Sequence, residues 1–273
     1  MDDLVQLAQV HDYWNGAACG ETAYAKGETV SEQLTAQTKA RYELEPYIFD
    51  FAKFHEGAGK SVLEIGVGMG ADHEQWAKHK PARLCGIDLT ERAIELTSWR
   101  LRESDLQSEL RVADAENLPF EDESFDVVYS WGVAHHSPNP PKILREISRV
   151  LRSDGVARIM IYHKWSIVGM MLWARYGAFR KTLAQVYAEH LESPGTKAYS
   201  VWQAGRIFKI SGLKPKFIRV ELSSGDLLTG AAGQQHQGLM LSTAKLFWPR
   251  WLLKKFARSC GLFLLIEARK IGR

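Results

Sequence analysis

The stretch from Ser61 to Gly70, SVLEIGVGMG, constrains the fold of this chain more than any other part of its sequence. Apolar residues lead into glycines at positions 66, 68 and 70. This pattern is typical of a buried strand that ends in a turn where every second residue lacks a Cβ. Such a turn usually opens onto a helix N-terminus, where unpaired N–H groups and the helix dipole favour polar or anionic ligand groups. We therefore expect a nucleotide-like ligand at this turn.

Strand-like and helix-like segments alternate around this turn. We predict strands at 61–65, 83–87, 110–113, 125–130 and 155–162, and helices at 71–79, 90–103 and 141–150, with a turn at Asp154-Gly155 before the last of these strands. Further along, 202–211 has the pattern of a helix, and 216–222 and 262–268 have that of strands. Alternation at this spacing predicts a doubly wound, mostly parallel α/β sheet. Before it, we expect helices at 3–10 and 32–54, the second broken near Pro46.

Composition excludes several classes of function. The net charge of +3 over 273 residues is too small to indicate a nucleic-acid partner. From Lys245 to Arg273 there are eight Lys or Arg against the single acid Glu267, and we interpret this basic excess as a solvated face. The three cysteines form no C-x-x-C pair, so neither a disulfide framework nor a metal site is predicted. The acidic N-terminus and the lack of a run of about 18 apolar residues predict a cytoplasmic protein.

The glycine turn alone leaves two cofactor classes open. A dinucleotide-binding fold uses G-x-G-x-x-G/A, which Gly66, Gly68 and Ala71 satisfy. It also uses an acid about 20 residues further on for the ribose hydroxyls, and Asp88 stands there. The pattern so far admits an NAD-binding oxidoreductase.

Motifs downstream resemble those of class I S-adenosylmethionine-dependent methyltransferases. Glu64-x-Gly66-x-Gly68-x-Gly70 is similar to the first motif of that family. Gly86-Ile-Asp88-Leu89 resembles the second, and the sequence from Ala113 to Phe120, which contains Asp114, resembles the third. The segments 124–131 and 149–155 resemble the fourth motif and the turn before strand five. The resemblance covers about residues 60–163 in the order and spacing of the family.

This resemblance implies a Rossmann-like fold that binds S-adenosylmethionine and releases S-adenosylhomocysteine. Asp88 would take the ribose hydroxyls, and Asp114 with the backbone amide after it would hold the adenine. The alternative for Asp88 is that it merely caps the next helix. The full set of implied cofactor residues is Glu64, Gly66, Gly68, Gly70, Asp88, Leu89, Asp114, Ala115, Glu116 and Trp131.

The family's sheet has seven strands, the last antiparallel, and residues 262–268 suit that strand. The expected organisation is an N-terminal helical cap over 1–56 and a methyltransferase domain over 57–273 with its core at 60–163. Insertions at about 164–200 and 223–261 would form a lid together with the cap.

The sequence predicts the class of acceptor and candidate catalytic residues, but not the acceptor molecule. Transfer from a sulfonium is an in-line displacement, and an oxygen acceptor needs a base. His135 and His136, after strand four, and Tyr13 in the cap are the candidates, although the histidine pair could merely shape its loop. The Asn-Pro-Pro-aromatic motif of many nitrogen methyltransferases is replaced by Ser130-Trp-Gly-Val. We therefore expect a small-molecule acceptor with an oxygen, sulfur or carbon nucleophile.

A membrane-surface enzyme is the other candidate. The apolar run 167–173 precedes Arg175, Arg180 and Lys181, and a basic amphipathic stretch covers 250–258. These could rest on anionic lipid while the enzyme methylates a lipid-like or quinol acceptor, or they could simply pack onto the sheet.

Overall fold

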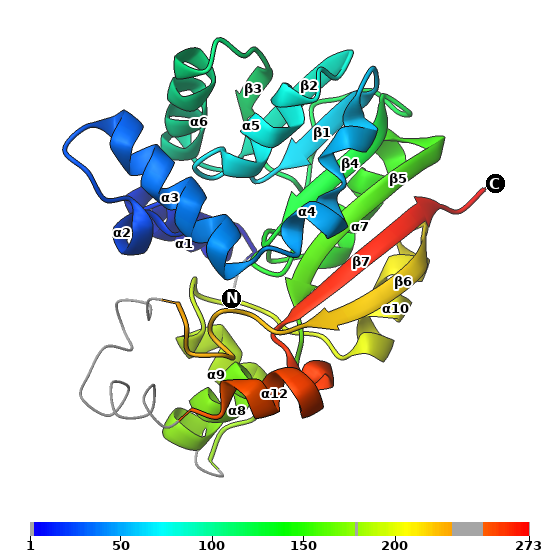
Figure 1. Ribbon diagram of the computed structural model, residues 1–273. Coiled ribbons are helices and arrows are strands. Elements are labelled where there is room, and N and C mark those ends of the chain that lie inside the picture. Colours follow the sequence, from blue (N-terminus) through cyan, green and yellow to red (C-terminus); the bar gives the residue numbers. More distant parts are fainter. Residues whose placement is uncertain (1–2, 178–179, 231–247, 273) are drawn as a thin grey trace.

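A seven-stranded sheet forms the centre of the computed structural model, which describes residues 3–177, 180–230 and 248–272. The strands lie in the order β3-β2-β1-β4-β5-β7-β6. β1 to β5 are parallel, and β7 is antiparallel to both β5 and β6 (Figure 1). Their bounds are β1 (Ser61–Ile65), β2 (Arg83–Asp88), β3 (Glu109–Val112), β4 (Phe125–Trp131), β5 (Leu151–Tyr162), β6 (Leu213–Glu221) and β7 (Phe263–Lys270). The predicted doubly wound, mostly parallel sheet is confirmed.

Helices cover both faces of this sheet. They are α4 (Ile48–Ala52), α5 (Ala71–Lys78) and α6 (Glu91–Glu103) on one face, and α7 (Pro140–Val150) and α10 (Val201–Ile210) on the other. The side chains of β7 show why helices have to cover both faces of the sheet. Leu264 and Ile266 belong to the core under α7 and α10, whereas Leu265 belongs to the core on the opposite face. Alternate side chains of a strand point to opposite faces, so an apolar strand such as β7 has to be covered twice.

Two predicted boundaries were wrong. β5 begins at Leu151, so the turn expected at Asp154-Gly155 lies inside the strand. There the pairing with β4 shifts register between Phe125 and Val127, and this irregularity absorbs the extra residues. The first helix, α1 (Asp3–Gly16), continues past position 10 and includes Tyr13.

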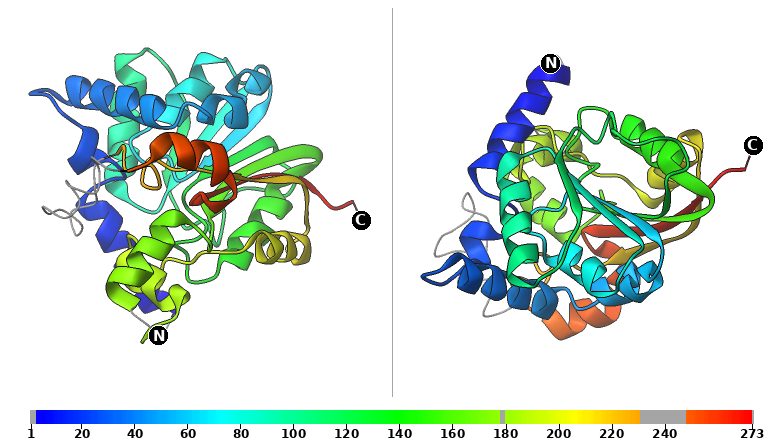
Figure 2. Two further views of the ribbon diagram at one scale, coloured as in Figure 1. Left: turned by 60° about the horizontal axis from the view of Figure 1, so that its bottom comes forward. Right: turned by 90° about the horizontal axis from the view of Figure 1, so that it is seen from above.

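The N-terminal helices lie beside α6 (Figures 1 and 2). They comprise α1, α2 (Glu21–Tyr24) and α3 (Val30–Leu44), followed by α4 and the short helix η1 (Phe54–Gly57). Thr29 and Glu32 form a capping box that starts α3, and α3 ends before Pro46, where the break was expected. Arg92 of α6 pairs with Glu21, and the Arg92 N–H donates to Asn15. These contacts anchor the N-terminal segment next to the carboxyl end of β2.

In its described part, the expected insertion between β5 and α10 contains three short helices. It forms α8 (Ile167–Leu172), the π-helix η2 (Trp173–Gly177) and α9 (Leu183–His190). Between β6 and β7 lie α12 (Arg250–Phe256) and η4 (Arg258–Cys260), while residues 231–247 of that expected insertion fall outside the described part.

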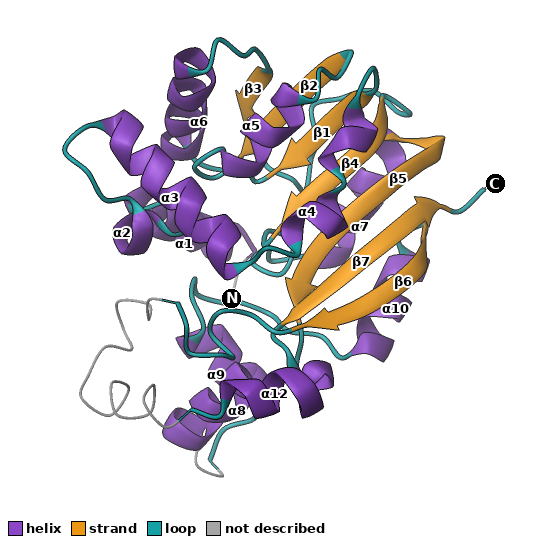
Figure 3. Ribbon diagram, in the orientation of Figure 1, coloured by secondary structure: helices purple, strands orange, loops and turns teal. Residues whose placement is uncertain are grey.

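These helices gather beyond the carboxyl end of β5 (Figure 3). Buried Asp226 joins the two segments, because its carboxylate accepts hydrogen bonds from the N–H groups of Val168 and Leu262. Among the described helices, we find none with the length and apolar character that a bilayer crossing requires.

Candidate active site

The glycine turn connects β1 to α5 and leaves open space above one glycine. Gly66, Gly68 and Gly70 have φ values of 81°, 53° and 77°. A Cβ on Gly66 would lie 2.1 Å from Val133 Cγ2, so packing requires that glycine. A Cβ on Gly68 would meet nothing within 4 Å. The backbone at Gly68 is therefore open to a ligand that approaches it closely, which fits the nucleotide-like ligand expected there.

Asp88, the last residue of β2, ties the glycine turn to the start of α6. Its Oδ2 accepts a hydrogen bond from Gly68 N at 3.1 Å, and its Oδ1 accepts from Thr90 N at 3.0 Å. Thr90 in turn caps α6 through Ala93 N. Burial raises the pKa of Asp88, although these donors oppose the shift. The helix-capping interpretation of Asp88 is thus part of its role. Because Oδ1 also accepts from Thr90 Oγ1 at 2.9 Å, Oδ2 is the oxygen that retains capacity for a further donor.

Asp114 follows β3 and organises the next loop. Its Oδ1 accepts from Glu116 N at 2.8 Å. Glu116 accepts from Asn139 N at 2.9 Å and from Ser137 Oγ, so the segment 114–116 is held against the loop after β4. Ala115 is buried between them, whereas Leu89, beside Asp88, is partly exposed.

Glu64 is buried beneath the turn rather than exposed beside it. Its Oε2 lies 2.9 Å from Nδ1 of His73 in α5. Burial raises the pKa of Glu64 well above its usual range and lowers that of His73 to about 3. Burial thus disfavours the charged form of each partner, and one hydrogen bond joins the Glu64 carboxyl to the His73 imidazole. Glu64 supports the helix that begins at the turn.

An ion pair that the sequence did not predict joins the N-terminal helices to α5. Asp72 accepts hydrogen bonds from Arg41 Nε at 2.8 Å, Tyr42 OH at 3.0 Å and Tyr129 OH at 2.7 Å. Burial alone would raise the pKa of Asp72, but the Arg41 guanidinium and these bonds hold it below its usual range. Arg41 also lies over the ring of Trp131, 5.4 Å from its centroid. Arg41 thus links α3 to the end of β4.

Three side chains meet beyond the ends of β4 and β5, and we name them the HHE cluster: His135, His136 and Glu192. Glu192 lies in the loop after α9, where no sequence pattern marked it. His136 Nε2 is 3.4 Å from Glu192 Oε2. His136 Nδ1 is held by Ser193 Oγ at 2.8 Å and by Thr196 Oγ1 at 3.0 Å. The cluster is therefore assembled by the first insertion and the loop after β4.

Tyr162, the last residue of β5, supports this cluster. Its hydroxyl donates to Glu192 Oε2 at 2.6 Å, and its ring stacks on His135 with centroids 3.8 Å apart. His135 is completely buried, and neither of its ring nitrogens has a hydrogen-bond partner among the described residues. Burial lowers the pKa of His135 well below its usual range, so this imidazole is neutral.

The N-terminal helix α1 reaches the same cluster. The indole of Trp14 lies edge-on to His136, with ring centroids 5.3 Å apart, and Tyr13 packs edge-on against Trp14 at 4.9 Å. Burial raises the pKa of the Tyr13 phenol, so it stays protonated at neutral pH. The structure thus places Tyr13 one aromatic ring away from the histidine pair.

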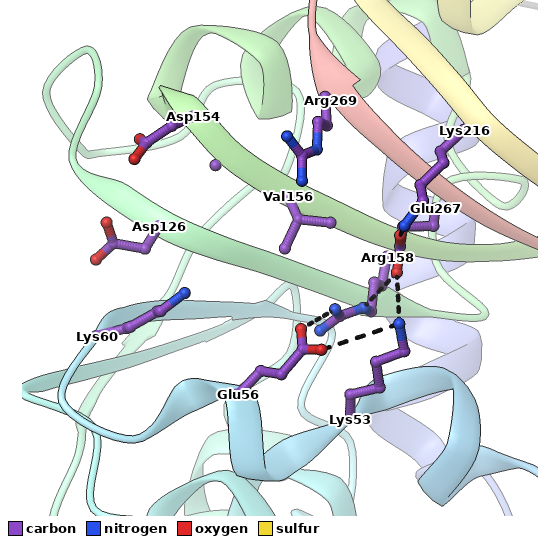
Figure 4. A pocket seen from close by; sticks show the side chains of 11 residues that line it. Lys53, Glu56, Lys60, Asp126, Asp154, Val156, Arg158, Lys216, Glu267 and Arg269 are labelled. Atoms are coloured by element: carbon purple, nitrogen blue, oxygen red, sulfur yellow. Dashed lines mark hydrogen bonds and ion pairs between the residues drawn. The ribbon is translucent and has the colours of Figure 1, made fainter.

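A second, charged pocket lies near the amino ends of the parallel strands (Figure 4). Arg158 donates to Glu267 Oε2 at 3.1 Å and pairs with Glu56, while Lys53 and Lys216 also reach Glu267. Its charges pair with one another and hold β5, β7 and η1 together. Ligands of parallel sheets bind beyond the carboxyl ends of the strands, so we interpret this pocket as structural.

Comparison with known proteins places part of the chain in one group. Residues 63–159 match the family model for a methyltransferase domain. The phthiotriol/phenolphthiotriol dimycocerosates methyltransferase of Mycobacterium leprae is 43% identical over 100 residues, which cover 36% of this chain and 36% of that protein. The 27-O-demethylrifamycin SV methyltransferase of Amycolatopsis mediterranei is 34% identical over 100 residues, covering 36% and 37%. The chain thus spans little more than a third of the length of these curated relatives.

Solved structures extend the likeness in fold to nearly the whole chain. The geranyl diphosphate C-methyltransferase of Streptomyces coelicolor A3(2) matches with a TM-score of 0.65 over 97% of this chain and 98% of its own, at 15% identity. A structure of geranyl diphosphate methyltransferase with GPP and sinefungin matches with a TM-score of 0.65 over 98% and 100%, at 18% identity. At such low identity, the likeness concerns the fold alone.

Proposed function

We propose that the chain is a class I S-adenosylmethionine-dependent methyltransferase that transfers the methyl group of this cofactor to a small-molecule acceptor. The observation that carries the proposal is the open backbone at Gly68, fixed by Asp88 at one end of a site whose other end is the HHE cluster. The cofactor supplies an electrophilic methyl group on a sulfonium. The chain has to bind it, orient the acceptor and exclude water.

Each end of the site has a proposed role. Gly66, Gly68 and Gly70 admit the amino-acid part of the cofactor, and Asp88 and Leu89 contact the ribose. Asp114, Ala115 and Glu116 hold the adenine, and Glu64 supports the turn. Trp131 lines the path from the cofactor to the acceptor, held in place by Arg41.

The acceptor would lie against the HHE cluster, which promotes loss of its proton, with Tyr13 and Trp14 excluding water. His136 is suited to this because two hydroxyl groups hold its Nδ1 and leave Nε2 directed at Glu192. Beside it, His135 supplies a neutral ring whose nitrogens have no hydrogen-bond partner in the described part of the chain. We propose oxygen as the first acceptor atom to test, with sulfur and carbon next.

A screen of labelled methyl transfer to phenols, carboxylic acids, quinols and thiols tests the activity. We expect His136→Ala to lower turnover at least about tenfold with S-adenosylhomocysteine affinity unchanged. Calorimetry distinguishes a methyltransferase from an NAD-binding oxidoreductase. Binding of NAD with no binding of S-adenosylhomocysteine would overturn the proposal. Cofactor binding with no turnover on any acceptor would leave a binding protein instead.

A lipid-like acceptor at a membrane surface is the second candidate. Trp251 of α12 is 71% exposed, and Lys254 and Lys255 follow it one helical turn later. Trp165 is 54% exposed. Exposed indoles beside lysines suit an anionic interface. Co-sedimentation with phosphatidylserine vesicles at low and moderate salt tests this, with neutral phosphatidylcholine vesicles as the control. No binding at low salt, or equal binding by Trp251→Ser, would remove the candidate.

We propose the cytoplasm as the location. The three cysteines are free, and Cys85 is buried in the sheet, as expected of a chain in a reducing compartment.

A further inference from the structure

The HHE cluster has the composition of a metal site, although the sequence predicted none. One ligand atom from each of His135, His136 and Glu192 lies within 4.8 Å of the other two. His136 Nε2 and Glu192 Oε2 are 3.4 Å apart. Two ligand atoms that each lie about 2.1 Å from the same ion are roughly 3.0–3.4 Å apart in an octahedral or tetrahedral site. The observed separation of 3.4 Å matches this geometry.

Surrounding contacts orient the ligand atoms. Ser193 and Thr196 engage Nδ1 of His136, which leaves Nε2 for the ion. The Tyr162 hydroxyl donates to Glu192. Metal-binding imidazoles nearly always use their second nitrogen in this way, and metal-binding carboxylates are held by such donors. Residues around the cluster therefore fix the orientation of the His136 and Glu192 side chains.

Two further features lack another explanation within the described residues. His135 is fully buried with both ring nitrogens unpartnered, and a buried polar group without a partner destabilises the fold. Glu192 has φ of 142°, a backbone conformation that side chains other than glycine rarely adopt. Strain of this kind is retained where the surrounding structure holds a residue for function. Both the orphan ring and the strained residue belong to the same cluster.

We propose that the HHE cluster binds a divalent transition-metal ion through one nitrogen from each histidine and one oxygen of Glu192. Two imidazoles and a carboxylate suit Zn²⁺, Fe²⁺ or Co²⁺, whereas Mg²⁺ and Ca²⁺ prefer oxygen ligands. Three protein ligands leave at least one coordination position open. That position would take the acceptor heteroatom and lower its pKa, so that its proton passes to solvent before the heteroatom bonds to the sulfonium methyl and S-adenosylhomocysteine leaves. This last clause rests on the proposed methyl transfer, whereas metal binding does not.

Metal binding is tested on the full chain after dialysis against EDTA. Calorimetry with Zn²⁺ should give one equivalent bound, and Co²⁺ should develop visible d–d bands. We expect the double variant His136→Ala/Glu192→Gln to weaken Zn²⁺ binding by about 100-fold or more and to abolish the Co²⁺ spectrum. His79→Ala, which removes the histidine that directly follows α5 and lies outside the cluster, is the matched control and should bind as the native chain does. Circular dichroism and S-adenosylhomocysteine affinity show that the variants are folded.

The outcomes separate the two proposals. Absence of binding, or equal binding by the double variant, overturns the metal site whatever the activity. A metal-free chain that turns over at the full rate removes the ion from the reaction and leaves the proposed transferase in place. Cluster-dependent metal binding without methyl transfer to any acceptor supports the site and counts against the proposed function.

Discussion

The hydroxyl of Tyr162 donates a hydrogen bond to Glu192 Oε2 over 2.6 Å, joining the last residue of β5 to the loop after α9. Glu192 belongs to an insertion, yet its carboxylate is positioned by the sheet. The same tyrosine stacks on His135, so one side chain positions two members of the HHE cluster. Tyr162 therefore ties two members of the HHE cluster to a core strand of the sheet.

Tyr162→Phe keeps the ring and removes only the donor. We expect turnover to fall about tenfold, because a hydrogen bond to a charged group contributes roughly 1.5–3 kcal/mol, and Glu192 is only partly buried. Affinity for S-adenosylhomocysteine should stay within about twofold, since the hydroxyl lies at the acceptor end. Steady-state kinetics and calorimetry measure the two effects. Full activity in the variant would show that Glu192 is positioned without Tyr162.

Gly66 and Gly68 should respond differently to an added methyl group. Gly68→Ala costs about 1 kcal/mol for its positive φ, but it fills the space where the cofactor approaches, so cofactor binding should be lost with little change in Tm. Gly66→Ala drives a Cβ into Val133 and should destabilise the fold by about 3 kcal/mol. Adding Val133→Ala should recover part of that stability. Thermal melts and calorimetry separate the two, and cofactor binding by Gly68→Ala would contradict the placement.

Asp88→Ala should weaken S-adenosylhomocysteine binding about tenfold or more. The carboxylate is proposed to bind the ribose, and it also accepts a hydrogen bond from the Gly68 N–H. Loss of the ribose contact and loss of this hydrogen bond should both weaken cofactor binding. Asp88→Asn keeps one acceptor oxygen for Gly68 and serves as the control for the turn. We expect its affinity to lie between those of the native chain and Asp88→Ala. If calorimetry gives all three the same Kd, the ribose is bound elsewhere.

Acid should expose the contribution of Glu267 to stability. Burial would raise its pKa, but hydrogen bonds from Lys216, Arg158 and Lys53 lower it from 4.5 to about 2. A carboxylate with a depressed pKa stabilises the fold above its unfolded pKa, and that stability is lost as pH falls from 4.5 towards 2.

Glu267→Gln should therefore lower the free energy of unfolding by about 2 kcal/mol at pH 7. The difference from the native chain should shrink as the pH approaches 2. Urea titrations over this pH range measure it, and a pH-independent difference would contradict the assignment.

The sheet and the geometry of the glycine turn could be predicted because their signals are local. Glycines at 66, 68 and 70 and the acids Asp88 and Asp114 lie at or just beyond the carboxyl ends of strands, so their positions follow from where those strands end. The turn expected at Asp154-Gly155 failed because pairing of β5 with β4 overrides the local turn preference of Asp-Gly.

The acceptor end could not be predicted in the same way. Glu192 and Arg41 act through partners far away in the sequence, the His136 imidazole and the Asp72 carboxylate. Nothing in their immediate neighbours marks them, and their roles appear only once the insertion and the N-terminal helices have packed against the loop after β4.

The position of β7 has a consequence for how the chain reaches its native state. β6 is hydrogen-bonded only to β7 within the sheet, and β7 is the last strand in the sequence although it lies between β5 and β6. During synthesis, β6 therefore leaves the ribosome without a pairing partner and has to wait until residues 263–270 emerge. Until then one edge of β5 is exposed, with Arg158 separated from Glu267. β7 therefore inserts between two strands that precede it in the chain, and the unpaired edges of β5 and β6 are covered only once it has done so.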